Sequence, residues 1–152
     1  MPEEPPSATA GQNTGAGTIA LCLAADIREI AALAAALDRF GTDNGIAPEA
    51  IFKVKLVLDE LINNVIDHGM VSPRDGRIDL GISLEGSSLV IDMTDNARLY
   101  DPFLTAPPDV EADMDSRPIG GLGVHIVRSL MSEASYSASE GRNHIRLRLD
   151  LA

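Results

Sequence analysis

The chain has 152 residues and a mass of 16.1 kDa, the usual size of one domain and too small for two. Hydrophobic residues make up 45% of the sequence and charged residues 23%, so a fully disordered chain is not expected, and the 3% of aromatic residues predicts an aliphatic core. The net charge of -11 repels phosphate backbones and anionic lipids at long range, which argues against nucleic acids and membranes as partners.

The first 17 residues are predicted to form a flexible tail before one globular domain at residues 18–152. The tail is rich in Pro, Gly, Ala, Ser and Thr, so it cannot offset the entropy cost of ordering. No Lys or Arg precedes Arg28, and the apolar run at residues 19–25 is too short to span a membrane. We therefore expect a cytoplasmic protein without an export signal. The single cysteine, Cys22, is expected to be a small core residue in a reducing compartment.

A strand is predicted at residues 18–24, followed by two helices. Asp26 can cap the first helix, which is expected to end at Gly41 and the turn residues 43–45, and whose apolar face carries Ile30, Leu33, Leu37 and Phe40. Pro48 fits the first turn of the second helix, which is predicted to run as an aliphatic segment from residue 51 to about residue 68.

The second half of the chain is predicted to contain two hairpins that flank a loop and a third helix. The first hairpin pairs residues 77–84 with 88–93, and the second pairs 134–139 with 144–151. Between them lie an irregular, Pro-rich loop at residues 100–118 and a helix at residues 124–131. This order predicts an α+β two-layer sandwich, in which helices cover one face of a mixed, mainly antiparallel sheet.

The second helix carries a polar stripe on a largely apolar surface. Glu60, Asn64 and His68 recur at i, i+4 and i+8 and so share one helix face. A buried carboxylate or amide without a partner is costly, so the stripe either faces solvent or lines a polar pocket. The residues alone leave both interpretations open.

A glycine run precedes the third helix, at Gly120, Gly121, Leu122 and Gly123. Glycines before a helix N-terminus let backbone N–H groups approach an anion, which the helix dipole also attracts. Such turns also occur for purely structural reasons, and the sequence has neither a Walker motif nor a dinucleotide fingerprint.

Asp95 lies just past the end of a predicted strand. In this position an aspartate is often a plain turn residue. A carboxylate there can also accept a hydrogen bond from an exocyclic amino group, which would select adenine over guanine.

The ordered combination of three segments resembles the GHKL ATP-binding fold of gyrase, Hsp90, histidine kinases and MutL. The segments are ELINNVIDHG at residues 60–69, DNARLYDP at 95–102 and GGLGVHIVRSLM at 120–131. The chain most resembles the short bacterial branch of this fold, the anti-sigma factor serine/threonine protein kinases of the RsbW and SpoIIAB type. The resemblance extends from about residue 18 to the C-terminus.

The resemblance implies a role for each motif. Glu60 would be the catalytic base toward a serine or threonine hydroxyl, and Asn64 would help to coordinate Mg²⁺ on the phosphates of ATP or ADP. Asp95 would bind the adenine amino group. Residues 100–118 would form a lid, and the phosphates would be held by the backbone of Gly121, Leu122 and Gly123.

The resemblance also implies a regulatory function. The protein would sequester a sigma factor, phosphorylate a STAS-domain anti-anti-sigma partner, and form a homodimer. His68 is interpreted as a helix-end residue, because a histidine kinase would need a phosphoacceptor helix that the sequence does not show.

Two residues depart from the family pattern. Ala97 stands where the family usually has a glycine that passes close to the base, and Val65 stands where alanine is common. Ala97 favours an alternative function, a catalytically inactive nucleotide-binding or purely sequestering module, whereas Glu60 and Asn64 favour the kinase. A clamp ATPase would need a transducer domain after the fold, which is not expected in a chain that ends at Ala152.

Overall fold

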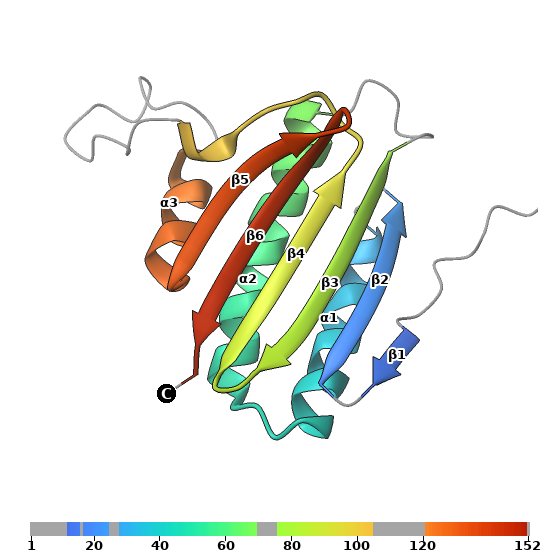
Figure 1. Ribbon diagram of the computed structural model, residues 1–152, viewed down its shortest axis with the longest axis vertical. Coiled ribbons are helices and arrows are strands. Elements are labelled where there is room, and N and C mark those ends of the chain that lie inside the picture. Colours follow the sequence, from blue (N-terminus) through green and yellow to red (C-terminus); the bar gives the residue numbers. More distant parts are fainter. Residues whose placement is uncertain (1–11, 16, 25–27, 70–75, 105–120, 152) are drawn as a thin grey trace, which may run out of the picture.

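The computed structural model describes residues 12–15, 17–24, 28–69, 76–104 and 121–151. In these ranges six strands form one sheet, whose order is β1-β2-β3-β4-β6-β5 (Figure 1). The strands are β1 Gln12–Gly15, β2 Thr18–Ala24, β3 Arg77–Glu85, β4 Ser88–Asp95, β5 Glu133–Ser139 and β6 Arg142–Asp150. All five ladders between them are antiparallel, so the parallel pairs of the predicted mixed sheet are not found among the described residues.

Three α-helices cover one face of the sheet (Figure 1). They are α1 Arg28–Asp43, α2 Pro48–Asn64 and α3 Gly121–Leu130. Two single turns accompany them, the π-helical η1 Val65–Gly69 after α2 and the 3-10 turn η2 Pro102–Leu104 after β4. The predicted α+β two-layer sandwich with helices on one face is confirmed.

The core lies between the sheet and the helices. In β2, β3 and β6 buried residues alternate with more exposed ones, as expected for a sheet with one covered face. Large side chains that are almost completely buried come from both layers: Leu37, Leu58, Leu61, Ile62, Ile78, Ile82, Leu89, Ile91, Met93 and Leu147. These residues confirm the aliphatic core that the composition predicts.

The same alternation corrects the prediction for Cys22. In β2 the residues Ile19, Leu21 and Leu23 point into the core, so Cys22 lies on the opposite, outer face of the sheet and is exposed. The alternation of buried and exposed residues is not visible in the sequence around Cys22, because the other outward positions of this apolar run are alanines.

The N-terminal segment also differs from the prediction. Residues 12–15, assigned to a flexible tail, form β1, which pairs with β2 at the sheet edge. Backbone hydrogen bonds to a neighbouring strand order this segment without large apolar side chains. Residues 1–11 of the predicted tail and the predicted helix cap at Asp26 lie outside the described residues.

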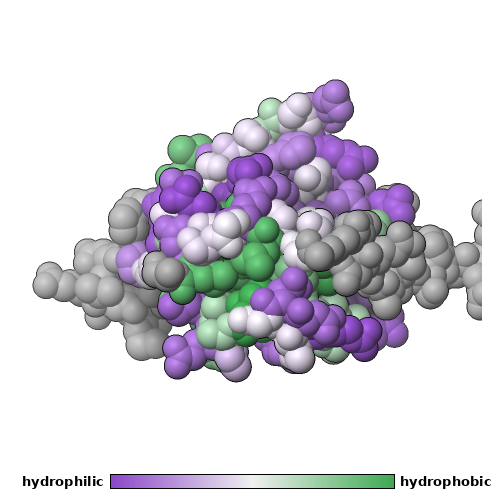
Figure 2. All heavy atoms as spheres, turned by 60° about the horizontal axis from the view of Figure 1, so that its bottom comes forward, coloured by the Kyte–Doolittle hydropathy of each residue, from purple (hydrophilic) through white to green (hydrophobic). Residues whose placement is uncertain are grey.

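Figure 2 brings the lower end of Figure 1 forward and shows an apolar band between polar residues.

Among the helices of the described ranges, none is long and apolar enough to cross a membrane.

Candidate functional site

The three sequence motifs meet at one end of the sandwich. In Figure 1 the C-terminal ends of α2 and β4 and the N-terminal end of α3 all lie at the upper end of the molecule. The helices α2 and α3 pack against each other in this arrangement. Segments far apart in the sequence therefore border the same region.

Asp95, the last residue of β4, is a buried carboxylate with only 2% of its surface exposed. Both hydrogen bonds that described residues donate to it go to Oδ1, from the Ala97 N–H at 2.9 Å and from Asn143 Nδ2 at 2.8 Å. Burial raises the pKa of Asp95, while these two hydrogen bonds and the nearby His144 act in the opposite direction. An inward-facing carboxylate with donors on one oxygen can present its other oxygen to a ligand.

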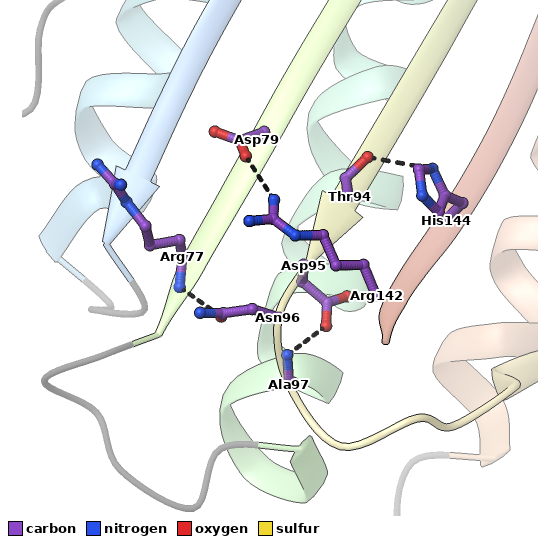
Figure 3. Close-up of polar contacts among 8 residues, drawn as sticks. All are labelled: Arg77, Asp79, Thr94, Asp95, Asn96, Ala97, Arg142 and His144. Atoms are coloured by element: carbon purple, nitrogen blue, oxygen red, sulfur yellow. Dashed lines mark hydrogen bonds and ion pairs between the residues drawn. The ribbon is translucent and has the colours of Figure 1, made fainter. Parts of the chain in front are cut away.

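Figure 3 shows how the loop after β4 is fixed next to Asp95. Asn96 Oδ1 accepts a hydrogen bond of 2.8 Å from the Arg77 N–H, at the start of β3. The outer face of the sheet beside this loop is polar and carries two cross-strand pairs: Arg142 with Asp79 at 3.6 Å, and Thr94 with His144 at 3.3 Å. The loop therefore leaves the sheet at a position set by β3 and β4 together.

A pocket borders Asp95 on the helix side of the sheet. It is narrow, with a cavity volume of about 20 Å³, and is lined by Leu61, Asn64, Val65, Asp95, Ala97, Arg98, Tyr100, Pro102, Asn143 and Ile145. The structure thus brings together the predicted site residues Asn64, Asp95 and Ala97. The stripe on α2 therefore includes a pocket residue and is not simply a solvated helix face.

Glu60 lies one helical turn before Asn64 on α2 and is half-buried, but it is not a lining residue of this pocket. His68 lies in η1, and its side chain is outside the described part of the structure.

The glycine run is only partly described. Gly121, Leu122 and Gly123 form the first turn of α3, so their backbone N–H groups have no acceptor within the helix itself. Gly120 lies outside the described residues.

Ala97 adopts an ordinary backbone conformation, since Glu140 is the one described non-glycine residue with positive φ. Its methyl group is buried, with 8% of the residue exposed. The backbone at position 97 therefore does not require glycine, although the methyl group occupies space at the pocket wall.

Asn143 is a site residue that the sequence analysis missed. It stands opposite Asp95 in the β4–β6 ladder and is 4% exposed. An isolated asparagine after a turn signal, Glu140-Gly141, gives no hint of this position. The position follows from the register between β4 and β6, and the sequence alone does not determine that register.

The start of the predicted lid is anchored to both sides of the site. The Tyr100 N–H donates to Asn143 Oδ1 at 3.0 Å, and Asp101 Oδ1 accepts from the Phe103 N–H at 2.8 Å in the first turn of η2. Arg128 of α3 donates to the Phe103 carbonyl oxygen and lies 5.4 Å from the centre of its ring. The rest of the predicted lid, residues 105–118, lies outside the described residues.

Residues 23–149 match the family model described as Histidine kinase-like ATPase domain. The chain is also similar to curated proteins named as kinases. It is 28% identical over 96 residues to the serine/threonine-protein kinase BtrW of Bordetella bronchiseptica. This alignment covers 63% of this chain and 68% of that protein. It is 29% identical over 101 residues to the serine-protein kinase RsbW of Listeria monocytogenes, which covers 64% of each.

Solved structures share the fold. The structure of the RsbU and RsbW domains of Rv1364c from Mycobacterium tuberculosis matches with a TM-score of 0.61 and 18% identity, over 87% of this chain and 32% of that one. The histidine kinase domain of the Erythrobacter litoralis EL346 blue-light activated kinase matches with a TM-score of 0.50 and 15% identity, over 80% of this chain and 60% of that one. At these identities the similarity concerns the fold alone.

Proposed function

The chain belongs to the histidine kinase-like ATPase domain family, and on this premise we propose that it is an ATP-dependent protein serine/threonine kinase of the anti-sigma factor type. The match confirms the GHKL resemblance that the motifs suggested, and the relatives named RsbW and BtrW support its kinase branch. The aligned segment spans 64% of the Listeria relative, so the activity and partners are proposed for this chain.

The buried carboxylate of Asp95 is the observation that carries the proposal. Its Oδ1 is held by two donors, and it lines a pocket whose other walls are largely apolar. The chemistry of these walls suits a flat, apolar base with one amino group, because the amino group can donate to the carboxylate while the ring packs against aliphatic side chains. We infer that Asp95 binds the adenine amino group, with Ala97 at the edge of the ring.

The phosphates would extend toward the N-terminal turn of α3. The backbone N–H groups of Gly121, Leu122 and Gly123 and the positive end of the helix dipole suit an anion. Mg²⁺ fits this arrangement, since it takes one or two protein ligands and completes its shell with phosphate oxygens and water. Asn64 lines the pocket with an amide and would hold the ion, which would neutralise phosphate charge when bound.

Glu60 is the proposed catalytic base. It lies one turn from Asn64 on the same face of α2, and we infer that it faces the phosphates. It would take the proton of a substrate serine or threonine hydroxyl, whose oxygen forms a bond to the γ-phosphorus while the bond to the bridging oxygen of ADP breaks.

The proposed biological role is the control of transcription in the cytoplasm. The protein would sequester a sigma factor and phosphorylate a STAS-domain anti-anti-sigma protein, as the resemblance to RsbW-type kinases suggests. A homodimer is part of this proposal. The alternative is a module that binds a nucleotide or a sigma factor without phosphotransfer, and the methyl group of Ala97 at the pocket wall is the observation that favours it.

Calorimetric titration with ATP, in the presence and absence of Mg²⁺, tests the site. Wild-type protein is expected to bind ATP better with Mg²⁺ than without, and better than GTP. Asp95→Asn replaces one acceptor oxygen by a donor and should lower ATP affinity at least about tenfold. No binding at millimolar nucleotide would reject the kinase and leave a sequestering module.

A phosphotransfer assay with a STAS-domain protein tests the chemistry. Glu60→Gln should slow transfer about 10²–10⁴-fold while ATP binding persists. The neighbouring Asp59→Asn is the matched control, since Asp59 borders a different groove, between α1 and α2. Equal losses in both variants would argue that Glu60 is not the base.

A further inference from the structure

We propose that Asn143 is a positioning residue that couples the Asp95 carboxylate to the start of η2. The proposal deepens the nucleotide site described above and rests on it. Nothing in the three motifs points to Asn143, which comes from a fourth segment, the start of β6.

The amide of Asn143 is engaged on both sides. Nδ2 donates to Asp95 Oδ1 at 2.8 Å and to the Arg98 carbonyl oxygen at 3.0 Å. Oδ1 accepts from the Tyr100 N–H at 3.0 Å and from the Tyr136 hydroxyl at 2.5 Å. A flipped amide would place its oxygen against a carboxylate and a carbonyl, so the partners fix its orientation.

The donor side of the amide, Asn143 Nδ2, determines which carboxylate oxygen of Asp95 is available to a ligand. Since Asn143 and the Ala97 N–H both bind Oδ1, the carboxylate cannot rotate without losing two buried hydrogen bonds. Asp95 lines the pocket, and we infer that its Oδ2 is the oxygen available there. The register pairing of Asp95 with Asn143 across β4 and β6 makes this contact a property of the sheet and not of a mobile loop.

The acceptor side of the amide, Asn143 Oδ1, holds the backbone at the start of η2. Tyr100 is the point at which the chain leaves the β4 loop for η2, and its N–H is held by the same amide that holds Asp95. From there Asp101 caps η2, and Arg128 ties Phe103 to α3. The amide thus joins the carboxylate proposed to face the base to η2 and, through Arg128, to α3.

Two nucleotides separate a positioning role from a structural one. ATP carries the amino group at C6 of the purine, and purine riboside triphosphate carries hydrogen there. If Asn143 acts through Asp95, its loss should weaken ATP more than the analogue, because only ATP uses the carboxylate. A general loosening of the fold would weaken both equally.

Asn143→Asp is the main variant, because it keeps the shape and the acceptor oxygen but places a second acceptor against Asp95. The preference for ATP over the analogue should fall at least about tenfold, the loss expected for a hydrogen bond to a charged group. Asn143→Ala, which adds no buried charge, should show the same loss of preference. Thr94→Val is the control, since Thr94 pairs with His144 on the outer face of the sheet, and its preference should stay at the wild-type value.

Amide hydrogen exchange at Tyr100 tests the contact between Asn143 and the start of η2. The exchange rate should rise in Asn143→Ala, which removes the acceptor, and stay near the wild-type value in Asn143→Asp, which keeps it. Equal loss of affinity for both nucleotides, or unchanged exchange at Tyr100 in Asn143→Ala, would overturn the coupling. Failure of the wild-type protein to bind either nucleotide would instead refute the proposed function.

Discussion

Gly41 of α1 lies so close to Ile51 of α2 that a Cβ atom on Gly41 would sit 2.6 Å from Ile51 Cγ1. Alanine is ordinarily favoured over glycine inside a helix by about 1 kcal/mol. Here the overpacked contact should outweigh that gain, because both residues are buried between two helices. We expect Gly41→Ala to lower the free energy of unfolding by about 1–3 kcal/mol, measured by urea titration.

A double-mutant cycle isolates this contact. Ile51→Ala removes the side-chain atoms that the new methyl group would meet, so Gly41→Ala should cost much less in that background. An increase in stability for Gly41→Ala in the wild-type chain would show that the helices move apart at little cost.

Gly41 also shows where local sequence patterns are insufficient. The turn residues predicted that Gly41 helps to end the first helix, but α1 continues to Asp43, and the glycine with positive φ that follows it is Gly45. A glycine that stops a helix and one that lets a second helix approach look the same in one sequence. The distinction depends on tertiary packing, which periodicity does not report.

The fold was predictable where one face of an element is apolar over many residues. The strand at Thr18–Ala24 and both hairpins follow from alternation and turn residues, and α1 follows from its apolar face. The segment Gln12–Gly15 lacks such a face, and its order comes from pairing with β2. Backbone pairing at a sheet edge leaves little trace in side-chain chemistry.

The pH dependence of stability should report the burial of Asp95. Since burial raises its pKa, the native state holds the proton more tightly than the unfolded chain does. The stabilising contribution of this group is therefore fully present below the ordinary value of 3.8 and is lost as the pH rises through the raised pKa. Asp95→Asn avoids this loss, so its stability relative to wild type should increase with rising pH.

Thermal unfolding at several pH values measures this effect. The melting temperature of Asp95→Asn relative to wild type should be higher at pH 7 than at pH 4. Asp92→Asn provides a control on the same strand, because Asp92 is exposed and its ion pair with Arg146 should contribute at most about 1 kcal/mol. A stability difference for Asp95→Asn that does not vary with pH would mean that the carboxyl stays solvated.

Ala97→Gly tests whether the departure from the family pattern matters. Ala97 has an ordinary φ, so glycine adds only flexibility and should cost about 0.5–1 kcal/mol of stability. If the methyl group is tolerated, the affinity for ATP should change by less than about threefold. A gain of tenfold or more would show that the methyl group obstructs the base, which would support the module without phosphotransfer.

Arg128→Ala should release η2 from α3. Arg128 is exposed, so its hydrogen bond to the Phe103 carbonyl and its stacking on the ring together should contribute about 1 kcal/mol. Local opening of η2 should then be about fivefold more frequent, measured as faster amide exchange at Phe103 and Leu104. Arg146→Ala, on the outer face of the sheet, is the matched control and should leave these rates unchanged. Unchanged exchange in Arg128→Ala would mean that Arg128 does not anchor η2, whose other end is held by Asn143 and Asp101.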